Sequence, residues 1–162
     1  MNVPNNDVDA ARVKIPPPLI YLGAVLAGVF LHLFVVPLTM TSVVGVEVRI
    51  GLVCLTALFG LVLLGAALGL FRRSGQDPKP WKSTPEIVTS GVYRWTRNPM
   101  YLGMAFLQAA LGFGLANGWI VLLIAPVLVA IYLIAIRHEE IYLEDKFGAS
   151  YVEYKASVRR WL

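Results

Sequence analysis

Four long apolar stretches limit most strongly what this chain can fold into. They cover residues 19–36, 50–71, 101–115 and 120–136 and contain no Asp, Glu, Lys or Arg. A helix that crosses a bilayer needs about 20 mostly apolar residues, so each stretch is interpreted as a transmembrane helix. The last two are short and are separated by a few turn residues, which predicts a tight, tilted hairpin. We therefore predict an all-α integral membrane protein with four transmembrane helices.

The composition supports a membrane protein. Hydrophobic residues make up 57% of the chain, charged residues 15%, and the mean hydropathy is +0.68, whereas soluble domains are about 45–50% apolar. Residues 1–18 are polar and end in three prolines, so we expect no cleaved signal peptide there. The single cysteine, Cys54, lies inside an apolar stretch and has no intrachain partner, which gives no indication of an oxidising compartment.

The same pattern predicts one domain over residues 1–162. We divide it, in chain order, into a cytoplasmic N-terminal segment (1–18), the first two helices (19–71), a cytoplasmic loop (72–100) and a helical hairpin with its tail (101–162). Short helices are expected in the C-terminal tail, on the cytoplasmic side.

The lysines and arginines predict the orientation. All of them except Arg49 lie in the N-terminal segment, in the loop 72–100 or beyond residue 136. Because basic residues favour the cytoplasmic side, we expect a multi-pass protein with both termini in the cytoplasm. The net charge of +4 then attracts anionic headgroups of the bilayer. A nucleic-acid partner is not expected, and nothing in the sequence indicates an obligatory protein partner.

A first polar cluster lies where the basic loop meets the third apolar stretch, at residues 97–103, Arg-Asn-Pro-Met-Tyr-Leu-Gly. Asparagine is a preferred N-cap and proline suits the first helical position, so Asn98 and Pro99 predict a helix start. The positive end of the helix dipole then faces the cytoplasmic interface and can receive an anionic group such as a carboxylate. A capped helix with arginines reaching the headgroups explains this motif equally when it is considered alone.

A second polar cluster, Arg137-His138-Glu139-Glu140, follows the fourth apolar stretch. The helix is expected to continue to residue 147 and to end at Gly148. A metal site here is a weak hypothesis, because adjacent residues point around a helix and lack zinc-type spacing. Since a hairpin brings the start of one helix beside the end of the next, the two clusters should form one pocket with both charge signs. Such a pocket fits a zwitterionic ligand, with its carboxylate near the arginine and its ammonium or hydroxyls near the glutamates.

The ordered combination of motifs resembles a known family. Residues 89–103 look like the Gly-x-Tyr…Arg-His-Pro-x-Tyr-x-Gly signature of the isoprenylcysteine carboxyl methyltransferase and phospholipid methyltransferase superfamily. Residues 139–160 are similar to its closing pattern, Glu-Glu…Phe-Gly-x-x-Tyr-x-x-Tyr. The resemblance covers roughly residues 85–162 and does not separate the branches of the superfamily.

The resemblance implies a membrane-embedded methyltransferase that uses S-adenosyl-L-methionine. Its cofactor pocket is expected to involve a set of residues from both clusters: Arg97, Asn98, Tyr101, Gly103, His138, Glu139 and Glu140. Asn98 departs from the family pattern, which has histidine at this position. Asparagine keeps the helix cap but has no titratable imidazole, so proton transfer by this position is not expected here.

The expected chemistry is methyl transfer to a lipophilic or lipid acceptor that enters from the bilayer. A carboxylate acceptor, as in isoprenylcysteine O-methylation, is already ionised at neutral pH and needs no base. An amine, as in phospholipid N-methylation, or a thiol would need a base, for which Glu140 or Glu139 is the candidate. Arg160 in the tail is predicted either to hold an acceptor carboxylate or phosphate or to anchor the tail to anionic lipid.

Two other function classes stay open at this point. Membrane sterol reductases that bind NADPH have a similar motif pattern but many more helices. A non-enzymatic protein with the same fold is the third class, and the survival of both polar clusters argues against it.

Several features within the predicted helices have no role in that chemistry. Small residues spaced four apart, Ala24/Gly28 and Gly65/Gly69, suit close helix packing. His32 and Gln108 are polar residues inside apolar stretches, where they mark either functional sites or interhelical hydrogen bonds.

Overall fold

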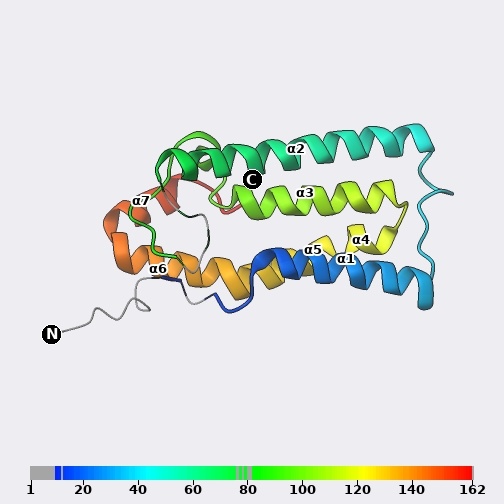
Figure 1. The fold of residues 1–162 in the computed structure, drawn as a ribbon, viewed down its shortest axis with the longest axis horizontal. Coiled ribbons are helices and arrows are strands. Elements are labelled where there is room, and N and C mark those ends of the chain that lie inside the picture. Colours follow the sequence, from blue (N-terminus) through cyan, green and yellow to red (C-terminus); the bar gives the residue numbers. More distant parts are fainter. Residues whose placement is uncertain (1–9, 12, 76, 78, 80–81, 162) are drawn as a thin grey trace.

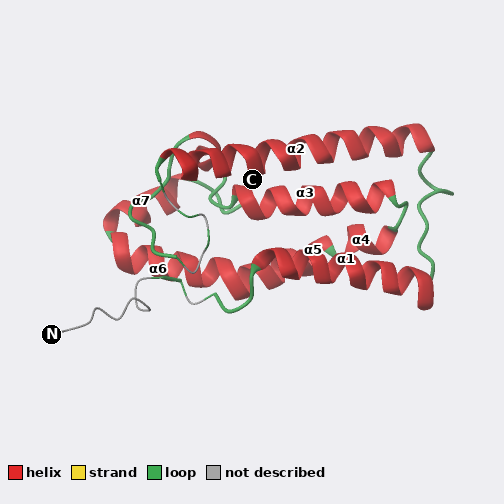
Figure 2. Ribbon diagram, viewed as in Figure 1, coloured by secondary structure: helices red, strands yellow, loops and turns green. Residues whose placement is uncertain are grey.

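The fold is all-helical in a computed structural model that describes residues 10–11, 13–75, 77, 79 and 82–161. Parts of the predicted N-terminal segment (1–9 and 12) and of the predicted loop (76, 78, 80 and 81) therefore lie outside the described residues. Figure 2 shows helices joined by loops, and the described residues contain no β-strand beyond one isolated bridge between Thr39 and Asn117. The elements are, in chain order, α1 (Pro17–Phe34), α2 (Val46–Arg73), the 3-10 turn η1 (Gly91–Arg94), α3 (Pro99–Gly114), α4 (Gly118–Leu122), α5 (Ile124–Ile131), the π-helical turn η2 (Tyr132–Ile136), α6 (Arg137–Phe147) and α7 (Ala149–Ser157).

Three helical segments of the described chain are long and apolar enough to cross a membrane. They are α1, α2 and the segment Gly118–Phe147, which includes α4 to α6. The third predicted span corresponds to α3, which has 16 residues and is shorter than the about 20 residues of a typical span. Four of the elements, α1, α2, α3 and α5, lie roughly side by side in Figure 1.

Close helix contacts in this bundle depend on particular glycines. A Cβ atom on Gly103 of α3 would lie 3.0 Å from the carbonyl oxygen of Gly60 in α2, and one on Gly28 would lie 2.7 Å from Ile120 Cγ1. By contrast, nothing lies within 4 Å of a Cβ built on Gly65 or Gly69. The prediction of close packing is therefore correct for Gly28 and wrong for Gly65 and Gly69, because the latter two do not face a neighbouring helix.

A compact polar turn joins α3 to α4. Ala116 adopts a positive φ of 50°, and the Asn117 side chain caps α4 by accepting hydrogen bonds from the backbone N–H groups of Trp119 and Ile120. The Asn117 amide also donates to the carbonyl oxygen of Gly28 at 3.2 Å. This single side chain thus fixes the beginning of α4 and connects it to α1.

The segment after α5 contains an irregularity that positions the second polar cluster. The π-helical turn η2 precedes α6 directly, and π-turns add a residue to the helical turn. Because one residue corresponds to about 100° of rotation in an α-helix, the added residue turns α6 relative to α5. The chain then ends α6 at Gly148, whose φ is 54°, and turns into α7 (Figure 1), and the tail after α7 reaches the start of α3.

Candidate active site

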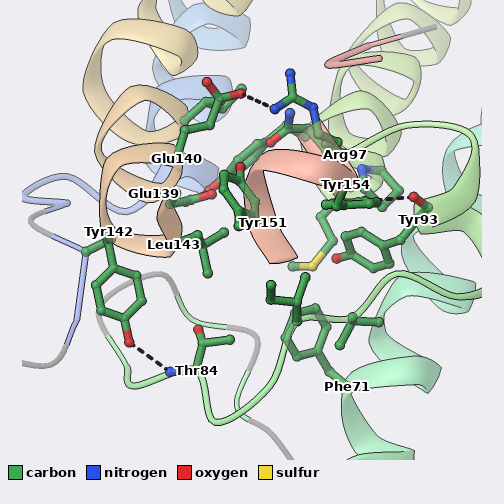
Figure 3. Close-up of a pocket in the computed structure, with 18 of the residues that line it drawn as sticks. Phe71, Thr84, Tyr93, Arg97, Glu139, Glu140, Tyr142, Leu143, Tyr151 and Tyr154 are labelled. Atoms are coloured by element: carbon green, nitrogen blue, oxygen red, sulfur yellow. Dashed lines mark hydrogen bonds and ion pairs between the residues drawn. The ribbon is translucent and has the colours of Figure 1, made fainter. Parts of the chain in front are cut away.

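A cavity lies at the end of the bundle where α2 ends and α3 and α6 approach each other. Its empty space, including the open mouth, is about 910 Å³. Figure 3 shows side chains from α2, α3, α6, α7 and the loop before η1 pointing into it. The predicted residues Arg97, Asn98, Tyr101, Glu139 and Glu140 all line this cavity. The structure therefore brings the two polar clusters of the sequence together.

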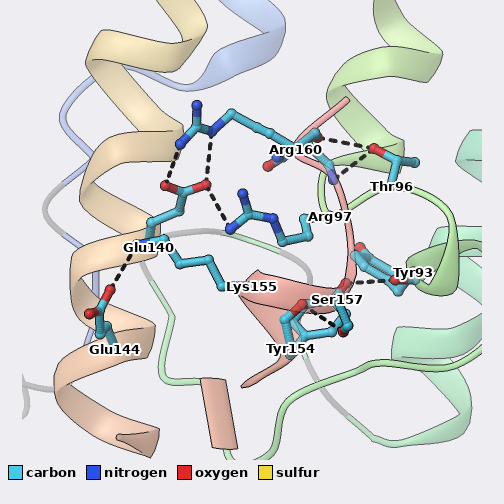
Figure 4. A network of polar contacts seen from close by, with 10 residues as sticks. Tyr93, Thr96, Arg97, Glu140, Glu144, Tyr154, Lys155, Ser157 and Arg160 are labelled. Atoms are coloured by element: carbon cyan, nitrogen blue, oxygen red, sulfur yellow. Dashed lines mark hydrogen bonds and ion pairs between the residues drawn. The ribbon is translucent and has the colours of Figure 1, made fainter. Parts of the chain in front are cut away.

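Glu140 is the centre of an ion-pair network between α6 and the C-terminal tail. Its carboxylate accepts a bidentate pair from Arg160, with Nε–Oε1 at 2.9 Å and Nη2–Oε2 at 3.0 Å. Arg97 Nη1 lies 3.2 Å from the same Oε1 atom. Glu140 is 8% exposed, so these two arginines compensate a buried charge (Figure 4). Removing either partner would leave the carboxylate incompletely compensated, which is costly in a buried site.

The tail is held against the start of α3 by backbone groups as well. The carbonyl oxygen of Arg160 accepts hydrogen bonds from Thr96 Oγ1 at 3.1 Å and from Asn98 Nδ2 at 3.0 Å. The backbone N–H of Arg97 donates to the carbonyl oxygen of Arg159 at 3.0 Å. Asn98 does precede α3 at the N-cap position, but its side chain makes no capping hydrogen bond. The predicted capping role of its side chain is therefore wrong, because the side-chain amide donates to the Arg160 carbonyl oxygen in the tail instead.

Glu139 belongs to a second, separate chain of hydrogen bonds. It accepts a short hydrogen bond from the Tyr101 hydroxyl. The Tyr101 carbonyl oxygen in turn accepts from the Tyr21 hydroxyl at 2.8 Å, which connects α6, α3 and α1. Glu139 and Glu140 are thus adjacent in sequence but are held by different partners.

Arg97 carries a buried donor in the cavity that is left without a partner. Its side chain is 9% exposed, and its Nε has no hydrogen-bond partner among the described residues. Its Nη1 makes no hydrogen bond either, but it is paired electrostatically with Glu140. Buried guanidinium N–H groups nearly always find acceptors. The Nε of Arg97 is therefore an unsatisfied donor that a ligand in the cavity could use.

Aromatic side chains form much of the wall, and the sequence predicted only Tyr101 among them. The cavity is lined by Phe71 and by five tyrosines: Tyr93, Tyr101, Tyr142, Tyr151 and Tyr154. Burial, and then the charge of Glu140, raise the pKa of Tyr151 to about 12. Burial is also the main cause that raises the pKa values of Tyr93 and Tyr154 above the usual phenol range. These phenols stay protonated at neutral pH, and Tyr154 donates to the carbonyl oxygen of Tyr93 at 2.7 Å.

The loop before η1 also contributes to the wall. Thr84, Glu86, Ile87 and Val88 line the cavity, and the backbone N–H of Thr84 donates to the Tyr142 hydroxyl at 3.1 Å. The tyrosines of the C-terminal pattern were visible in the sequence. The loop had no sequence signal, because a non-helical segment reaches the cavity only through tertiary contacts.

Three of the predicted site residues do not line the cavity. Gly103 lies against α2 and allows the close approach to Gly60. His138 is exposed. Arg160 is engaged by Glu140, and its guanidinium lies 4.6 Å from the centre of the Tyr132 ring, so it reaches the cavity only through Glu140. The described residues contain no cluster of three or more potential metal ligands.

Comparison with known proteins identifies the family. Residues 46–150 match the model of the family described as phospholipid methyltransferase. The chain belongs to the phospholipid methyltransferase family. The match begins at the first residue of α2. It includes all of the site residues predicted from the sequence except Arg160, which lies in the tail.

Two relatives share part of the chain. Protein-S-isoprenylcysteine O-methyltransferase of Saccharomyces cerevisiae is 38% identical over 80 residues, which are 44% of this chain and 30% of the yeast protein. An uncharacterized protein of Haemophilus influenzae is 40% identical over 63 residues, which are 39% of this chain and the whole of that protein. The match thus spans less than a third of the length of the yeast enzyme. No solved structure matches the chain significantly.

Proposed function

We propose that this protein is an S-adenosylmethionine-dependent methyltransferase of the membrane, and that its acceptor is lipophilic. The observation that supports it most is one cavity lined by Arg97, whose Nε has no partner among the described residues, by the carboxylate of Glu139 and by several aromatic side chains. Family membership and the similarity to the yeast O-methyltransferase support this proposal. The preferred acceptor is a carboxylate, as in isoprenylcysteine O-methylation.

The side chains of the cavity suit the charges of the cofactor. Arg97 would bind its carboxylate through Nε, which has no partner among the described residues and can give a charge-assisted hydrogen bond. Glu139 would accept hydrogen bonds from its ammonium or ribose hydroxyls. The tyrosines would contact the adenine ring and the sulfonium, since aromatic faces attract cations. When bound, the cofactor would supply an electrophilic methyl group.

The residues of this chain would act mainly by positioning. Methyl transfer needs alignment of the acceptor with the methyl group, and alignment alone accounts for large rate effects in enzymes. A carboxylate acceptor needs no base, which suits the site because Glu140 already pairs with two arginines. The ion-pair network then keeps α6, the tail and the start of α3 in a fixed arrangement around the cavity.

Phospholipid N-methylation is the second candidate function. It would require removal of a proton from an amine, and Glu139 would be the base because it is not paired with an arginine. The description of the matched family favours this possibility. A sterol-reductase-like function with NADPH has no observation in its favour in the described residues.

The membrane arrangement belongs to the same proposal. We propose four spans, with α3 as the third and α4 to η2 as the fourth, and both termini on the cytoplasmic side. This would put the cavity at the cytoplasmic interface, within reach of a soluble cofactor and of an acceptor in the bilayer. The exposed apolar faces of α1 and α2, such as Leu26 at 60% and Leu58 at 60% exposure, support contact with lipid.

Ligand-induced thermal stabilisation tests the proposal. S-adenosylhomocysteine should raise the unfolding midpoint of the purified protein, because a ligand of the folded state stabilises it, and NADPH should not. Glu139→Gln should weaken binding about tenfold, since it removes a charged acceptor. Exposed Glu153→Gln is the matched control and should bind normally. Stabilisation by NADPH alone would exclude the methyltransferase proposal.

Transfer of a radiolabelled methyl group then separates the two acceptors. The assay uses a prenylcysteine analogue with a free carboxylate and, in parallel, phosphatidylethanolamine in vesicles. We expect base-labile methyl ester from the first and no product from the second. Labelled phosphatidylethanolamine alone would establish the second candidate instead.

A further inference from the structure

A second hollow lies between α1 and α3, separate from the cavity described above. Its empty space is about 560 Å³. Apolar side chains form nearly all of its wall, and the lining residues are Pro18, Tyr21, Leu22, Val25, Met104, Leu107, Gln108 and Leu111. We call it the α1–α3 groove. Its α1 side includes Leu22, which is 52% exposed on the outer surface of the bundle, so the groove opens sideways.

Gln108 gives the groove one unsatisfied polar atom. The residue is 2% exposed, and its Nε2 donates to the carbonyl oxygen of Ile120 at 2.9 Å. This bond fixes which end of the amide carries nitrogen. The other end, Oε1, is buried and has no partner among the described residues. An unpaired buried acceptor is unfavourable, so a ligand with a donor would gain from occupying this position.

The groove and the candidate active site follow each other along one face of α3 without sharing a lining residue. Tyr101 lines the cavity, whereas Met104, Gln108 and Leu111 line the groove, and residues three or four apart share a helix face. Tyr21 connects their walls: it lines the groove, and its hydroxyl donates to the carbonyl oxygen of Tyr101, a residue that lines the cavity. Gln108 follows Tyr101 by about 10 Å along the helix axis, at 1.5 Å per residue.

We propose that the α1–α3 groove binds the apolar chain of the methyl acceptor, and that Gln108 Oε1 accepts a hydrogen bond from a hydroxyl or amide N–H on that chain. The proposal rests on the proposed function, because it names the acceptor class for the same site. The acceptor is then a lipid with a donor group roughly 10 Å from its reactive end. An unmodified hydrocarbon chain would fill the apolar walls but leave Gln108 unpaired, so it is disfavoured relative to the substituted chain.

Photolabelling of the full chain in phosphatidylcholine nanodiscs tests the groove without methyl transfer. The probe is a diazirine-bearing hexadecanol, and its methyl ether, which cannot donate a hydrogen bond, is the matched comparison. We expect the alcohol to label the groove residues of α1 and α3 about fivefold more than the ether, the effect of roughly one hydrogen bond. Gln108→Leu should make the two probes equal.

Two further variants distinguish a specific loss of groove labelling from a general effect of misfolding. Leu22→Trp fills the mouth of the groove without touching Gln108 and should reduce labelling by both probes. Leu58→Trp, on the exposed face of α2, should change neither. Equal labelling of the wild type by both probes, or labelling spread over α2 and the groove alike, would overturn the proposal.

Photolabelling and ligand-induced stabilisation distinguish a failure of the groove proposal from a failure of the proposed function. Loss of groove labelling with S-adenosylhomocysteine stabilisation intact would refute the groove alone. Groove labelling without that stabilisation would support a lipid site and refute the methyltransferase proposal.

Discussion

At the residue scale, the guanidinium of Arg160 contacts Glu140, which lines the cavity, and does not line the cavity itself. The sequence suggested that its guanidinium holds an acceptor or anchors the tail to lipid, but the structure pairs both of its bonding nitrogens with one buried carboxylate. The hydrogen bond with Glu140 is also the main cause that raises the pKa of Arg160. The same residue offers its carbonyl oxygen to Asn98 and Thr96. Arg160 is therefore a positioning residue in this structure.

Arg160→Lys should separate charge from geometry. Lysine keeps the positive charge but loses the planar fork, so one of two hydrogen bonds to Glu140 is lost. We expect destabilisation by about 1–2 kcal/mol, as for a bond to a charged group, measured as a lower midpoint in thermal unfolding. Arg159→Lys is the control, because that side chain is exposed. An unchanged midpoint in Arg160→Lys would show that the fork contributes nothing to folding.

Asn98 stands where the family pattern has a histidine, and its contacts explain why either residue fits this position. The amide donates one hydrogen bond to the carbonyl oxygen of Arg160 at 3.0 Å, which a neutral imidazole N–H can also do. We expect Asn98→His to keep the thermal midpoint within a few degrees. Asn98→Asp has the same shape but only acceptors, so it should lower the midpoint by several degrees. Equal midpoints for the two variants would mean that this hydrogen bond does not hold the tail.

At the scale of the elements, helix ends were predictable and the cavity wall was not. Asn98 and Pro99 correctly marked the start of α3, and Gly148 the end of α6, because these signals are local properties of the backbone. The π-helical turn η2 between α5 and α6 had no local signal in the sequence. The tyrosines and the loop residue Thr84 reach the cavity through contacts between distant segments, which periodicity does not encode.

The placement of the predicted site residues followed the same pattern, whereas their roles remain proposals. Residues that end or begin a helix, such as Arg97 and Glu139, were brought together in the cavity. Gly103 lies in the same motif but turns toward α2, because successive residues of a helix point in different directions.

The contact between α2 and α3 gives a matched pair of glycine substitutions. Gly103→Ala would put a methyl group 3.0 Å from the carbonyl oxygen of Gly60 and 2.9 Å from Leu64 Cγ, so the helices must separate. We expect destabilisation by about 1–3 kcal/mol, as in overpacked cores. Gly65→Ala meets nothing within 4 Å and should be neutral or slightly stabilising, since alanine favours helix. Thermal unfolding in detergent measures both, and similar midpoints would contradict the close α2–α3 contact.

At the scale of the whole molecule, charge and cavity lie at the same end of the bundle. The elements that form the cavity include η1, α6 and α7, and these carry or adjoin most of the arginines and lysines. The connection between α1 and α2 lies at the opposite end in Figure 1 and carries no basic residue before Arg49. A cytoplasmic cavity would therefore agree with the bias of basic residues toward the cytoplasm.

Cysteine labelling in sealed cells tests this orientation. In a Cys54→Ala background, which removes the only native thiol, one variant carries Thr89→Cys in the loop before η1 and the other carries Val43→Cys between α1 and α2. Both positions are exposed, Val43 at 85%, so accessibility depends on the side of the membrane. An impermeant maleimide added outside should label Val43→Cys at once and Thr89→Cys only after the cells are opened, because basic loops stay in the cytoplasm. Immediate labelling of Thr89→Cys with a silent Val43→Cys would reverse the orientation and move the cavity to the outer face. Immediate labelling of both would place the two connections on one side, which the four-span arrangement does not allow because α2 crosses the bilayer between them.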